Sequence, residues 1–349
     1  MNELECRQLS LGSFGAHSMV SATVSNSIAR AAAVIGATWA ALVLPAPIFP
    51  AQANSQPEPI VAFTVYSLAL GREPWVTDGT RQGTRMLRDI VPGWGESFPS
   101  TFTWVGDGRF TFIATDGVTG HELWISDGTA DGTHLLRDIQ NGAGSSQPSK
   151  LYPLGNGQFL FSADDGLRGR ELWTTDLTRQ GTRPLKNIRS AEQGSDPQLF
   201  TALGTGRYVF SAHDGINGVE PWVTDGTRAG TRLLRDLNPG SDSSNPAEFT
   251  DLGNGHMVFN ANVNQIWITD GTRKGTKLIR QLPFIIPKPG IPTSTSPVGF
   301  VSLDLGRAMF AADDGEHGLE PWITDGTTAG TRMVRDITKG LKGSKILSL

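Results

Sequence analysis

A short motif that occurs six times constrains the fold of this chain more than any other feature of its sequence. The fourth copy reads Glu-Pro-Trp-Val-Thr-Asp-Gly-Thr over residues 220–227, and a second Gly-Thr pair follows at residues 230–231. Each copy has a tryptophan at the same place: Trp75, Trp124, Trp173, Trp222, Trp267 and Trp322. Successive tryptophans are 49, 49, 49, 45 and 55 residues apart. A nearly fixed period of this length indicates repeated supersecondary units.

One complete repeat contains four short apolar segments. In the fourth copy they are Gln198–Leu203, Arg207–Ala212, Val219–Thr224 and Thr231–Leu237. Glycine-containing turns separate them, and each segment is too short for a helix. Four strands at a period near 49 predict an all-β, six-bladed β-propeller of four-stranded antiparallel blades around a central channel. An open solenoid of stacked sheets is the alternative.

The two ends of the repeat region bear on how such a ring would close. The first copy starts at its second strand, Ala62–Tyr66, and the last copy continues into Gly343–Leu349. We therefore expect Lys345–Leu349 to complete the first blade by strand exchange. The two irregular spacings are explained by a shortened turn at Asn260–Gln265 and by a proline-rich insertion within Pro283–Pro297.

The N-terminal residues have the pattern of an export signal. A small apolar run, Ala31–Leu44, follows Arg30 and leads into Ala51-Gln52-Ala53, which matches an A-x-A cleavage site. We predict a signal peptide over residues 1–53, a linker over 54–58 and the six-repeat domain over 59–349, with Met19 as an alternative start. The expected location is secreted or extracytoplasmic, at the cell envelope. An uncleaved N-terminal anchor is the alternative, although prolines make the run a poor membrane span.

Composition excludes some classes of partner. The formal net charge is only −4, so no broad basic surface for nucleic acid is expected. The single cysteine, Cys6, lies in the predicted signal peptide, which leaves the mature chain without a thiol for a disulfide or a cysteine-based metal site. We expect a monomer without a membrane span in the mature chain.

The repeat resembles a known family. The segments His121–Thr129 and Arg170–Asp176 contain Glu-Leu-Trp-x-x-Asp, and the former continues as Gly-Thr, so the chain is similar to the ELWxxDGT repeat family of exported bacterial proteins. The resemblance covers roughly residues 63–340 and implies a propeller-like fold and export, with no assigned reaction. Leu177 and Gln265 depart from the motif, and three copies read Glu-Pro-Trp. The Asp-Gly-Thr turn also resembles the structural Asp-box hairpin of sialidase-like propellers.

The repeated tryptophans are interpreted as packing residues. Pairing the two strands around the turn places Trp222 roughly opposite Leu234. Every copy has an aliphatic residue at that place: Leu87, Leu136, Leu185, Leu234, Ile279 and Val334. We therefore predict that the tryptophans pack between blades, the alternative being exposed rings that stack on sugars.

The repeated aspartates are interpreted as turn caps. They are Asp78, Asp127, Asp176, Asp225, Asp270 and Asp325, and each directly precedes the Gly-Thr of its turn, or Leu177-Thr178 in the third copy. Calcium is the alternative, with Asp164-Asp165 and Asp313-Asp314 as partial ligands. No cofactor and no metal-ligating residue is assigned.

A basic residue and a glutamate also recur. The basic residues are Arg88, Arg137, Lys186, Arg235, Arg280 and Arg335, and the glutamates are Glu73, Glu122, Glu171, Glu220 and Glu320. The simplest register sets each glutamate opposite a late aspartate, an unfavourable pair of like charges. A one-residue bulge would set it opposite the basic residue, so we predict a salt bridge. The fifth copy loses both acids together, as Gln265 and Gln281.

No catalytic residue is assigned, and the sequence disfavours an enzyme without excluding one. The histidines after the signal, His121, His134, His213, His256 and His317, occupy different repeat positions, and Tyr66, Tyr152 and Tyr208 stand in no recognisable motif. Paired carboxylates for glycoside hydrolysis stay open. A single active site requires asymmetry, so the irregular parts are better candidates: Pro283–Pro297, Gly93–Glu96 and the shortened fifth turn.

These observations favour an exported module that binds or scaffolds a protein or a glycan. Two alternatives remain: a carbohydrate-active hydrolase or lyase with its site at the channel mouth, and a calcium-dependent adhesion protein.

Overall fold

A computed structural model describes residues 60–284 without Ala191 and Thr205, residues 296–341 without Asp304, and Gly343, Ser344 and Ile346. The predicted signal peptide, the linker of residues 54–58 and most of Pro283–Pro297 lie outside these residues. So does the predicted closing strand Lys345–Leu349, apart from Ile346. Contacts divide the chain into residues 1–54 and 55–349, and everything described here belongs to the second unit.

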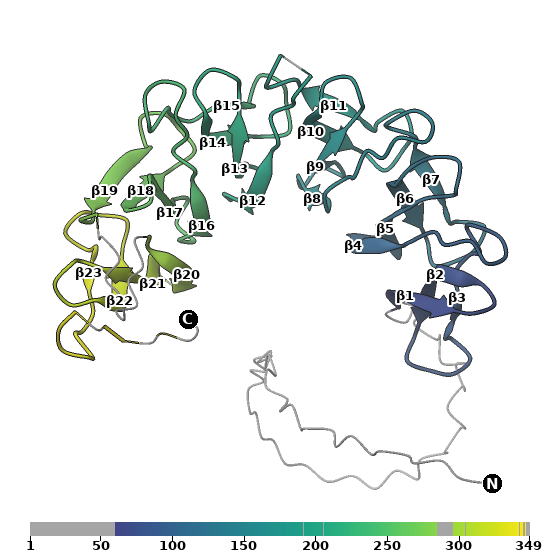
Figure 1. The fold of residues 1–349 in the computed structure, drawn as a ribbon, viewed down its shortest axis with the longest axis horizontal. Helices are drawn as coiled ribbons and strands as arrows, with labels where there is room; N and C mark the ends of the chain where they lie inside the picture. Colours follow the sequence, from purple (N-terminus) through teal and green to yellow (C-terminus); the bar gives the residue numbers. More distant parts are fainter. Residues whose placement is uncertain are drawn as a thin grey trace, which may run out of the picture. The chain divides into compact units, whose positions relative to one another are not determined.

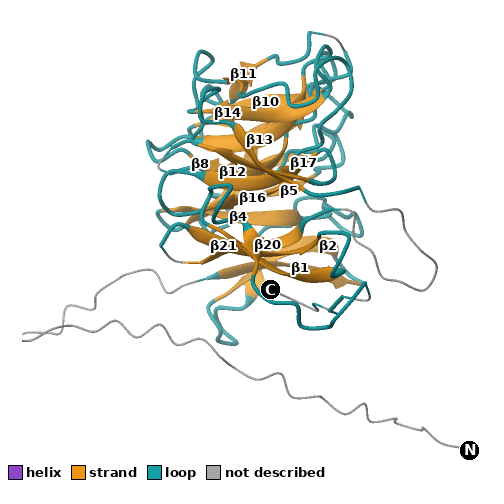
Figure 2. Cartoon of the chain, turned by 90° about the vertical axis from the view of Figure 1, so that its left-hand side faces the viewer, coloured by secondary structure: helices purple, strands orange, loops and turns teal. Residues whose placement is uncertain are grey.

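The described residues form six antiparallel sheets and no helix (Figures 1 and 2). The first sheet contains β1 (Val61–Ser67), β2 (Gly71–Thr77) and β3 (Arg85–Met86). The second contains β4 (Ser100–Gly106), β5 (Arg109–Ala114), β6 (Glu122–Ser126) and β7 (His134–Arg137), and the third β8 (Tyr152–Pro153), β9 (Phe159–Asp164), β10 (Arg170–Thr175) and β11 (Arg183–Lys186). The fourth contains β12 (Gln198–Ala202), β13 (Tyr208–His213), β14 (Val219–Thr224) and β15 (Arg232–Leu233). The fifth contains β16 (Ala247–Asp251), β17 (Met257–Ala261), β18 (Gln265–Thr269) and β19 (Lys277–Gln281), and the sixth β20 (Val298–Leu303), β21 (Arg307–Asp313), β22 (Leu319–Thr324) and β23 (Arg332–Met333).

Every sheet is a meander whose spatial strand order is its chain order. This confirms the predicted all-β class and six antiparallel units, and the arrangement is propeller-like. The first sheet has three strands because it lacks a counterpart of β4, as expected from a first copy that starts at its second strand. Within the described residues the first and sixth sheets share no strand.

Neighbouring sheets pack through a repeated pair of aromatic residues. In each sheet the motif tryptophan lies directly opposite a phenylalanine of the preceding strand, as in Phe161 opposite Trp173 and Phe210 opposite Trp222. Phe161 and Trp173 share a buried cluster with Leu123 and Ile125 of the second sheet. Because successive side chains of a strand point to opposite faces, each sheet offers aromatic rings to one neighbour and aliphatic side chains to the other. The five motif tryptophans from Trp124 onward are buried, which confirms packing between blades.

The strand that follows the turn pairs one residue out of the predicted register. Trp222 lies opposite Leu233, and not opposite Leu234 as we expected. In the second sheet Leu123 pairs with Arg137 while Trp124 pairs with Leu135, so one extra residue, Leu136, forms a β-bulge. The bulge lets Leu136 turn into the core, where it is 3% exposed.

The meander separates two kinds of connection. The strand ends on one side of the molecule carry the turns between first and second strands together with the Asp-Gly-Thr turns, and we call this side the turn face. The opposite strand ends carry the loops between second and third strands and the linkers that lead into the next sheet, and we call this side the linker face. First strands of neighbouring sheets approach each other, since β12 contacts β16 and β16 contacts β20.

Candidate functional site

Four pockets follow the linker face from the first sheet to the fifth. They lie at successive sheet junctions and have volumes of about 290, 440, 290 and 470 Å³. We name them the 1/2, 2/3, 3/4 and 4/5 pockets after the sheets they adjoin. Volumes near 300–1,000 Å³ are typical of sites for small ligands.

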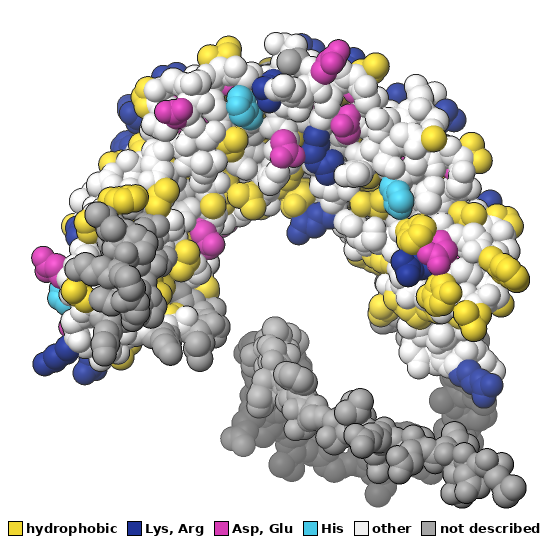
Figure 3. Space-filling view, viewed as in Figure 1, with side chains coloured by type: hydrophobic (Ala, Val, Ile, Leu, Met, Phe, Trp, Pro, Cys, Tyr) yellow, Lys and Arg dark blue, Asp and Glu magenta, His cyan; other side chains and the backbone are white. Residues whose placement is uncertain are grey.

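Three of these pockets, the 2/3, 3/4 and 4/5 pockets, share lining residues with their neighbours. Arg170 lines both the 2/3 and the 3/4 pocket. Asp196, Gln198 and Leu199 line both the 3/4 and the 4/5 pocket. We call the four pockets together the linker-face band. Figure 3 shows histidine, basic and acidic side chains on the face turned to the viewer, over the second to fourth sheets.

A ladder of rings joins the 1/2 pocket to the rest of the band. The guanidinium of Arg72 lies 6.0 Å from the centre of the Tyr66 ring and 5.0 Å from that of Phe98. Phe98 in turn lies 6.1 Å from the ring of His121, which lines the 2/3 pocket. Trp94, 85% exposed, lines the 1/2 pocket beside Tyr66. The band therefore has an aromatic end and a polar middle.

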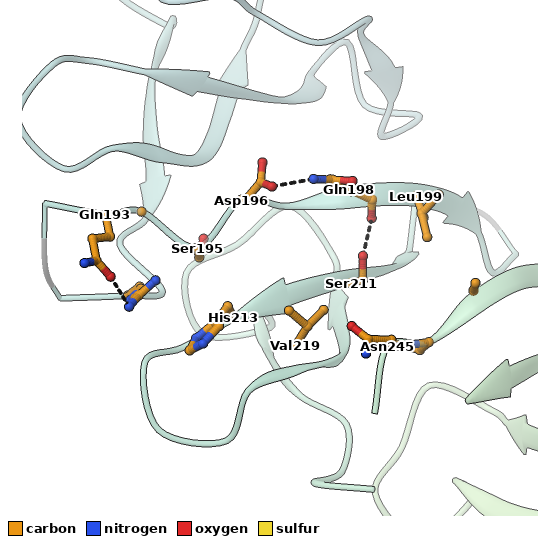
Figure 4. Close-up of a pocket in the computed structure, with 13 residues that line it drawn as sticks. Gln193, Ser195, Asp196, Gln198, Leu199, Ser211, His213, Val219 and Asn245 are labelled. Atoms are coloured by element: carbon orange, nitrogen blue, oxygen red, sulfur yellow. Dashed lines mark hydrogen bonds between the residues drawn. The ribbon is translucent and has the colours of Figure 1, made fainter. Parts of the chain in front are cut away.

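The 4/5 pocket shows how the polar part is built (Figure 4). The side chain of Gln198 donates to Asp196, and the carbonyl of Gln198 accepts from Ser211 Oγ at 3.4 Å. His213 Nδ1 accepts a hydrogen bond from the N–H of Gly215 at 2.7 Å. A ring nitrogen that accepts carries no proton, so the neutral His213 has its proton on Nε2 and offers that N–H as a donor.

The linkers that line the band share one backbone conformation. In four linkers the residue before a proline has a left-handed backbone: Phe98, Gln147, Asp196 and Asn245, with φ between 43° and 49°. This conformation costs about 1–3 kcal/mol for a residue other than glycine. The preceding residue is always a buried serine: Ser97, Ser146, Ser195 and Ser244. The backbone is thus the same at each junction while the displayed side chain differs.

Buried glutamates hold this backbone conformation in place. Glu122 accepts hydrogen bonds from the N–H groups of Ile139, Gln140 and Ser146 and from Ser146 Oγ. Glu73, Glu171, Glu220 and Glu320 accept equivalent bonds from the end of their own repeat and from the linker serine. Burial raises the pKa of Glu122, against the opposing effect of these hydrogen bonds.

The predicted salt bridge between glutamate and basic residue is therefore wrong. None of the ion pairs among the described residues includes a motif glutamate. The bulge exists, but it lies between the glutamate and the tryptophan, so the glutamate stays opposite the late acid. Gln265 pairs directly with Gln281 in the fifth sheet, where both acids are replaced.

The basic residues instead bridge neighbouring sheets. Arg235 Nη1 donates to the carbonyl of Thr276 in the next sheet at 3.1 Å, and its guanidinium lies 5.8 Å from the ring of Trp267. Arg137 and Lys186 make the same two contacts with the sheet that follows them. Within the part of the chain that the structure describes, none of them forms an ion pair with an acid of its own repeat.

The repeated aspartates cap their turns, as predicted. Asp127 Oδ1 accepts from the N–H of Thr129 at 2.9 Å and from its hydroxyl at 2.7 Å, and all six copies repeat this pair of bonds. The hydroxyl of Thr129 and then its N–H lower the pKa of Asp127. No cluster of three or more metal-ligating side chains occurs among the described residues. Asp165 and Asp314, the calcium alternatives, cap loops of the linker face.

The structure gathers some of the candidate residues and separates others. His121 and His213 line the band, whereas His134, His256 and His317 line none of the four pockets. Tyr152 shares the 3/4 pocket with Arg170, and burial raises the pKa of its phenol, which disfavours a nucleophilic phenolate. Asp196 is the one carboxyl group that lines the 3/4 and 4/5 pockets, so these pockets do not assemble a carboxylate pair.

Among the irregular segments, Gly93–Glu96 contributes to the band through Trp94 and Glu96. The shortened fifth turn lines none of the four pockets; there Asn262 Nδ2 donates to Gln265 Oε1 at 2.9 Å and Asn264 Nδ2 to the carbonyl of Leu282 at 2.7 Å. Sequence reasoning missed Arg170, Asp196 and Gln198. A usable signal existed, because these residues vary between copies while the surrounding serine, proline and glycine recur.

Comparisons with known proteins give fold-level likenesses only. No family model matches the chain, and no curated protein matches it. In the described residues there is no helix of the length and apolar character needed to cross a membrane.

Several solved structures are similar to this chain. A puromycin-hydrolyzing peptidase of Mycobacterium tuberculosis is 12% identical, with 80% of this chain and 43% of that one covered and a TM-score of 0.40. Prolyl oligopeptidase B from Galerina marginata is 12% identical, with 82% and 41% covered and a TM-score of 0.44. Regucalcin, a calcium-binding protein of Agrobacterium tumefaciens, is 16% identical, with 66% and 72% covered and a TM-score of 0.35. The chain spans about half or less of the length of the peptidases, and likenesses this low assign it no activity.

Proposed function

We propose that this protein is a binding module whose ligand is a glycan held along the linker-face band. The observation that carries the proposal is the continuity of the band, in which neighbouring pockets share Arg170, Asp196 and Gln198. A continuous row of small pockets suits a linear chain of repeating units better than one compact ligand.

The chemistry of the lining supports the same ligand class. Amide, hydroxyl, guanidinium and imidazole groups at the middle of the band are donors and acceptors suited to sugar hydroxyls. Tyr66 and Trp94 add exposed ring faces at one end, and aromatic rings present flat apolar area with little loss of side-chain entropy on binding. The turn face differs from this, because the same aspartate caps recur on it in every sheet.

The test is affinity electrophoresis of the protein in gels that contain soluble neutral or acidic polysaccharides, followed by calorimetry with any that retard it. We expect retardation by at least one polysaccharide and its loss in Arg170→Ala and in Gln198→Ala. Arg273→Ala and His256→Ala alter exposed side chains of the turn face and serve as controls that keep binding. Equal retardation of all variants would contradict the proposal.

Two further outcomes separate the alternatives. Release of new reducing ends from a bound polysaccharide would identify a hydrolase. Binding of a protein partner through the band, with no polysaccharide retained, would replace the glycan by a protein ligand.

We further propose that the sheets close into a six-bladed propeller by pairing of Lys345–Leu349 with the free edge of β1. Ser344 supports this, because it contacts Glu320 at 2.9 Å as the linker serines contact their own glutamates. Leu349 occupies the repeat position of Phe102, Leu151, Phe200, Phe249 and Phe300. Leu349→Asp should lower the melting temperature by several degrees and Ser348→Asp should not. Equal stability of the two variants would argue against closure.

Export, monomeric state and membership of the ELWxxDGT family complete the proposal. The sequence pattern of residues 31–53 supports export, and the repeated motif supports the family. Sequencing the N-terminus of protein recovered outside the cytoplasm should give Asn54 as the first residue. Recovery of an intact N-terminus would favour the uncleaved anchor.

A further inference from the structure

In four repeats a glutamate and a late aspartate occupy the two positions at which Gln265 and Gln281 pair directly in the fifth sheet. The motif glutamates Glu73, Glu122 and Glu220 and their counterpart Glu320 are at most 1% exposed. The late acid of the same repeats, Asp89, Asp138, Asp236 or Asp336, has a buried Oδ1 without any hydrogen-bond partner. A buried unpaired carboxylate oxygen costs several kcal/mol, and the same defect recurs four times.

The two remaining repeats show what fills this position when a donor is available. In the third repeat Asn187 replaces the aspartate, and its amide nitrogen donates to Glu171 Oε1 at 3.1 Å once the amide is oriented to suit its neighbours. In the fifth repeat both acids are replaced, and Gln265 Nε2 donates to Gln281 Oε1 at 2.8 Å. In both repeats in which one of the two side chains is an amide, that amide donates a hydrogen bond to the other side chain.

We propose that each of the four acid pairs, Glu73/Asp89, Glu122/Asp138, Glu220/Asp236 and Glu320/Asp336, holds one proton between its two carboxyl groups in the folded protein. This proton lies between the aspartate Oδ1 and the glutamate, at the place of the amide hydrogen of Asn187 in the third repeat. The other aspartate oxygen remains an acceptor, since Asp138 Oδ2 accepts from the N–H of Gly142 at 3.1 Å. The four pairs are therefore proton-binding sites built into the sheets.

The surroundings of the pairs favour a proton over a cation. The glutamate oxygens already accept N–H and hydroxyl groups, which repel a metal ion. No lysine, arginine or histidine among the described residues forms an ion pair with these glutamates. Burial raises the pKa of Glu73 and of Glu220, and the neighbouring Asp89 and Asp236 raise them further.

The pairs make stability depend on pH in a defined direction. The folded protein binds these protons above the pH at which free carboxyl groups, with pKa values of about 4, have lost theirs. Stability contributed by the shared protons is therefore present at mildly acidic pH and falls as the pH rises through the raised pKa values of Glu73, Glu122 and Glu220.

The experiment compares melting temperatures between about pH 5 and about pH 8. The variants are Asp89→Asn/Asp138→Asn/Asp236→Asn/Asp336→Asn, which gives every acid pair the amide of the third repeat, and Asn187→Asp, which adds a fifth pair. We expect the fourfold variant to match the native protein at the acidic end and to melt several degrees higher at the basic end. Asn187→Asp should steepen the decline. Histidines and surface acids are common to all three proteins and cancel in the comparison.

Infrared spectroscopy provides a readout that does not depend on stability. The native protein at neutral pH should show the carbonyl stretch of protonated carboxyl groups, and the fourfold variant should have lost it. A fourfold variant with the same pH dependence and the same infrared band as the native protein would overturn the proposal. A melting temperature that falls when a chelator is added would also overturn it, because it would assign the pairs to a cation.

Discussion

At the scale of single residues, the Asp-Gly-Thr turn is closed by a network that leaves no room for side-chain atoms. In the fourth copy Thr227 Oγ1 donates to Asp225 and accepts from the N–H of Gly230 at 2.9 Å. A Cβ atom on Gly230 would lie about 2.0 Å from the Asp225 carboxylate. Glycine is required here by close approach, whereas Gly226, with φ of 81°, sits in the left-handed region.

Gly230→Ala should therefore destabilise the protein by about 1–3 kcal/mol, as overpacked sites do. The measurement is chemical unfolding of the single variants Gly230→Ala and Asp225→Ala and of the double variant. The double variant should lose less than the sum of the two single losses, because the clash needs both groups. Additive losses would show that the carboxylate is not what excludes the methyl group.

Turn chemistry was readable from the sequence, and the partner of each glutamate was not. An Asp-Gly-Thr triplet is local, so its cap follows from the residues themselves. The glutamate acts over 17 to 24 residues, on Ile139 N–H and Ser146 for Glu122, and depends on where the bulge falls. One residue of register decides whether Asp or Arg is opposite, and spacing alone does not fix it. Leu177 is a second case that the local sequence does not predict. It has the left-handed φ of 67° that glycine has in the other copies, and its buried side chain stabilises it there.

At the scale of the elements, two kinds of contact join one repeat to the next. The glutamate of the third strand fixes the linker that leaves the sheet, and the basic residue of the fourth strand reaches the following sheet. The first contact is buried and carries several hydrogen bonds, whereas Arg235 remains exposed. A buried hydrogen-bonded contact contributes more to stability than an exposed one, because breaking it leaves buried donors without acceptors.

Replacing the glutamate should be severe. Glu122→Ala leaves four donors of Ile139, Gln140 and Ser146 without an acceptor, and each buried one costs about 1–3 kcal/mol. We expect a loss of more than about 3 kcal/mol in unfolding free energy, and a milder effect for Glu122→Gln, which keeps one acceptor. A loss as small as that of a surface substitution would contradict this role.

Replacing the basic residue should be mild. Arg235→Met removes the bond to Thr276 while keeping packing over Trp267, and its exposure limits the loss to about 1 kcal/mol. Arg235→Lys should restore most of this, because Lys186 fills the same position in the third repeat. Denaturation curves test whether Arg235→Met loses more unfolding free energy than Arg235→Lys. Equal losses would show that charge is not involved.

At the scale of the whole molecule, the linker-face band brings together side chains of successive sheets. The 2/3, 3/4 and 4/5 pockets each combine side chains of two repeats. The number and order of sheets therefore set the length of the proposed binding surface, and the residues that vary between repeats set its chemistry. The residues that recur between repeats hold the linker backbone in one conformation. The residues that differ between repeats line the pockets of the linker-face band.

Affinity should accordingly rise with the length of the bound oligosaccharide. Each added unit engages a further pocket at a high effective concentration, until the band is filled. Calorimetry with oligosaccharides of increasing length should show a rise and then a plateau, and Arg170→Ala should lower the plateau because it interrupts the centre of the band. Affinity independent of length would indicate one isolated pocket.

The residue before each linker proline has a practical consequence for protein engineering. Phe98, Gln147, Asp196 and Asn245 share one backbone conformation, held by a serine, a glutamate and a proline that do not change. Because four dissimilar side chains already occupy this conformation, exchanging them between repeats should leave the melting temperature nearly unchanged. The chain thus offers four equivalent grafting positions, at which a library could vary recognition while the scaffold bears the cost of folding.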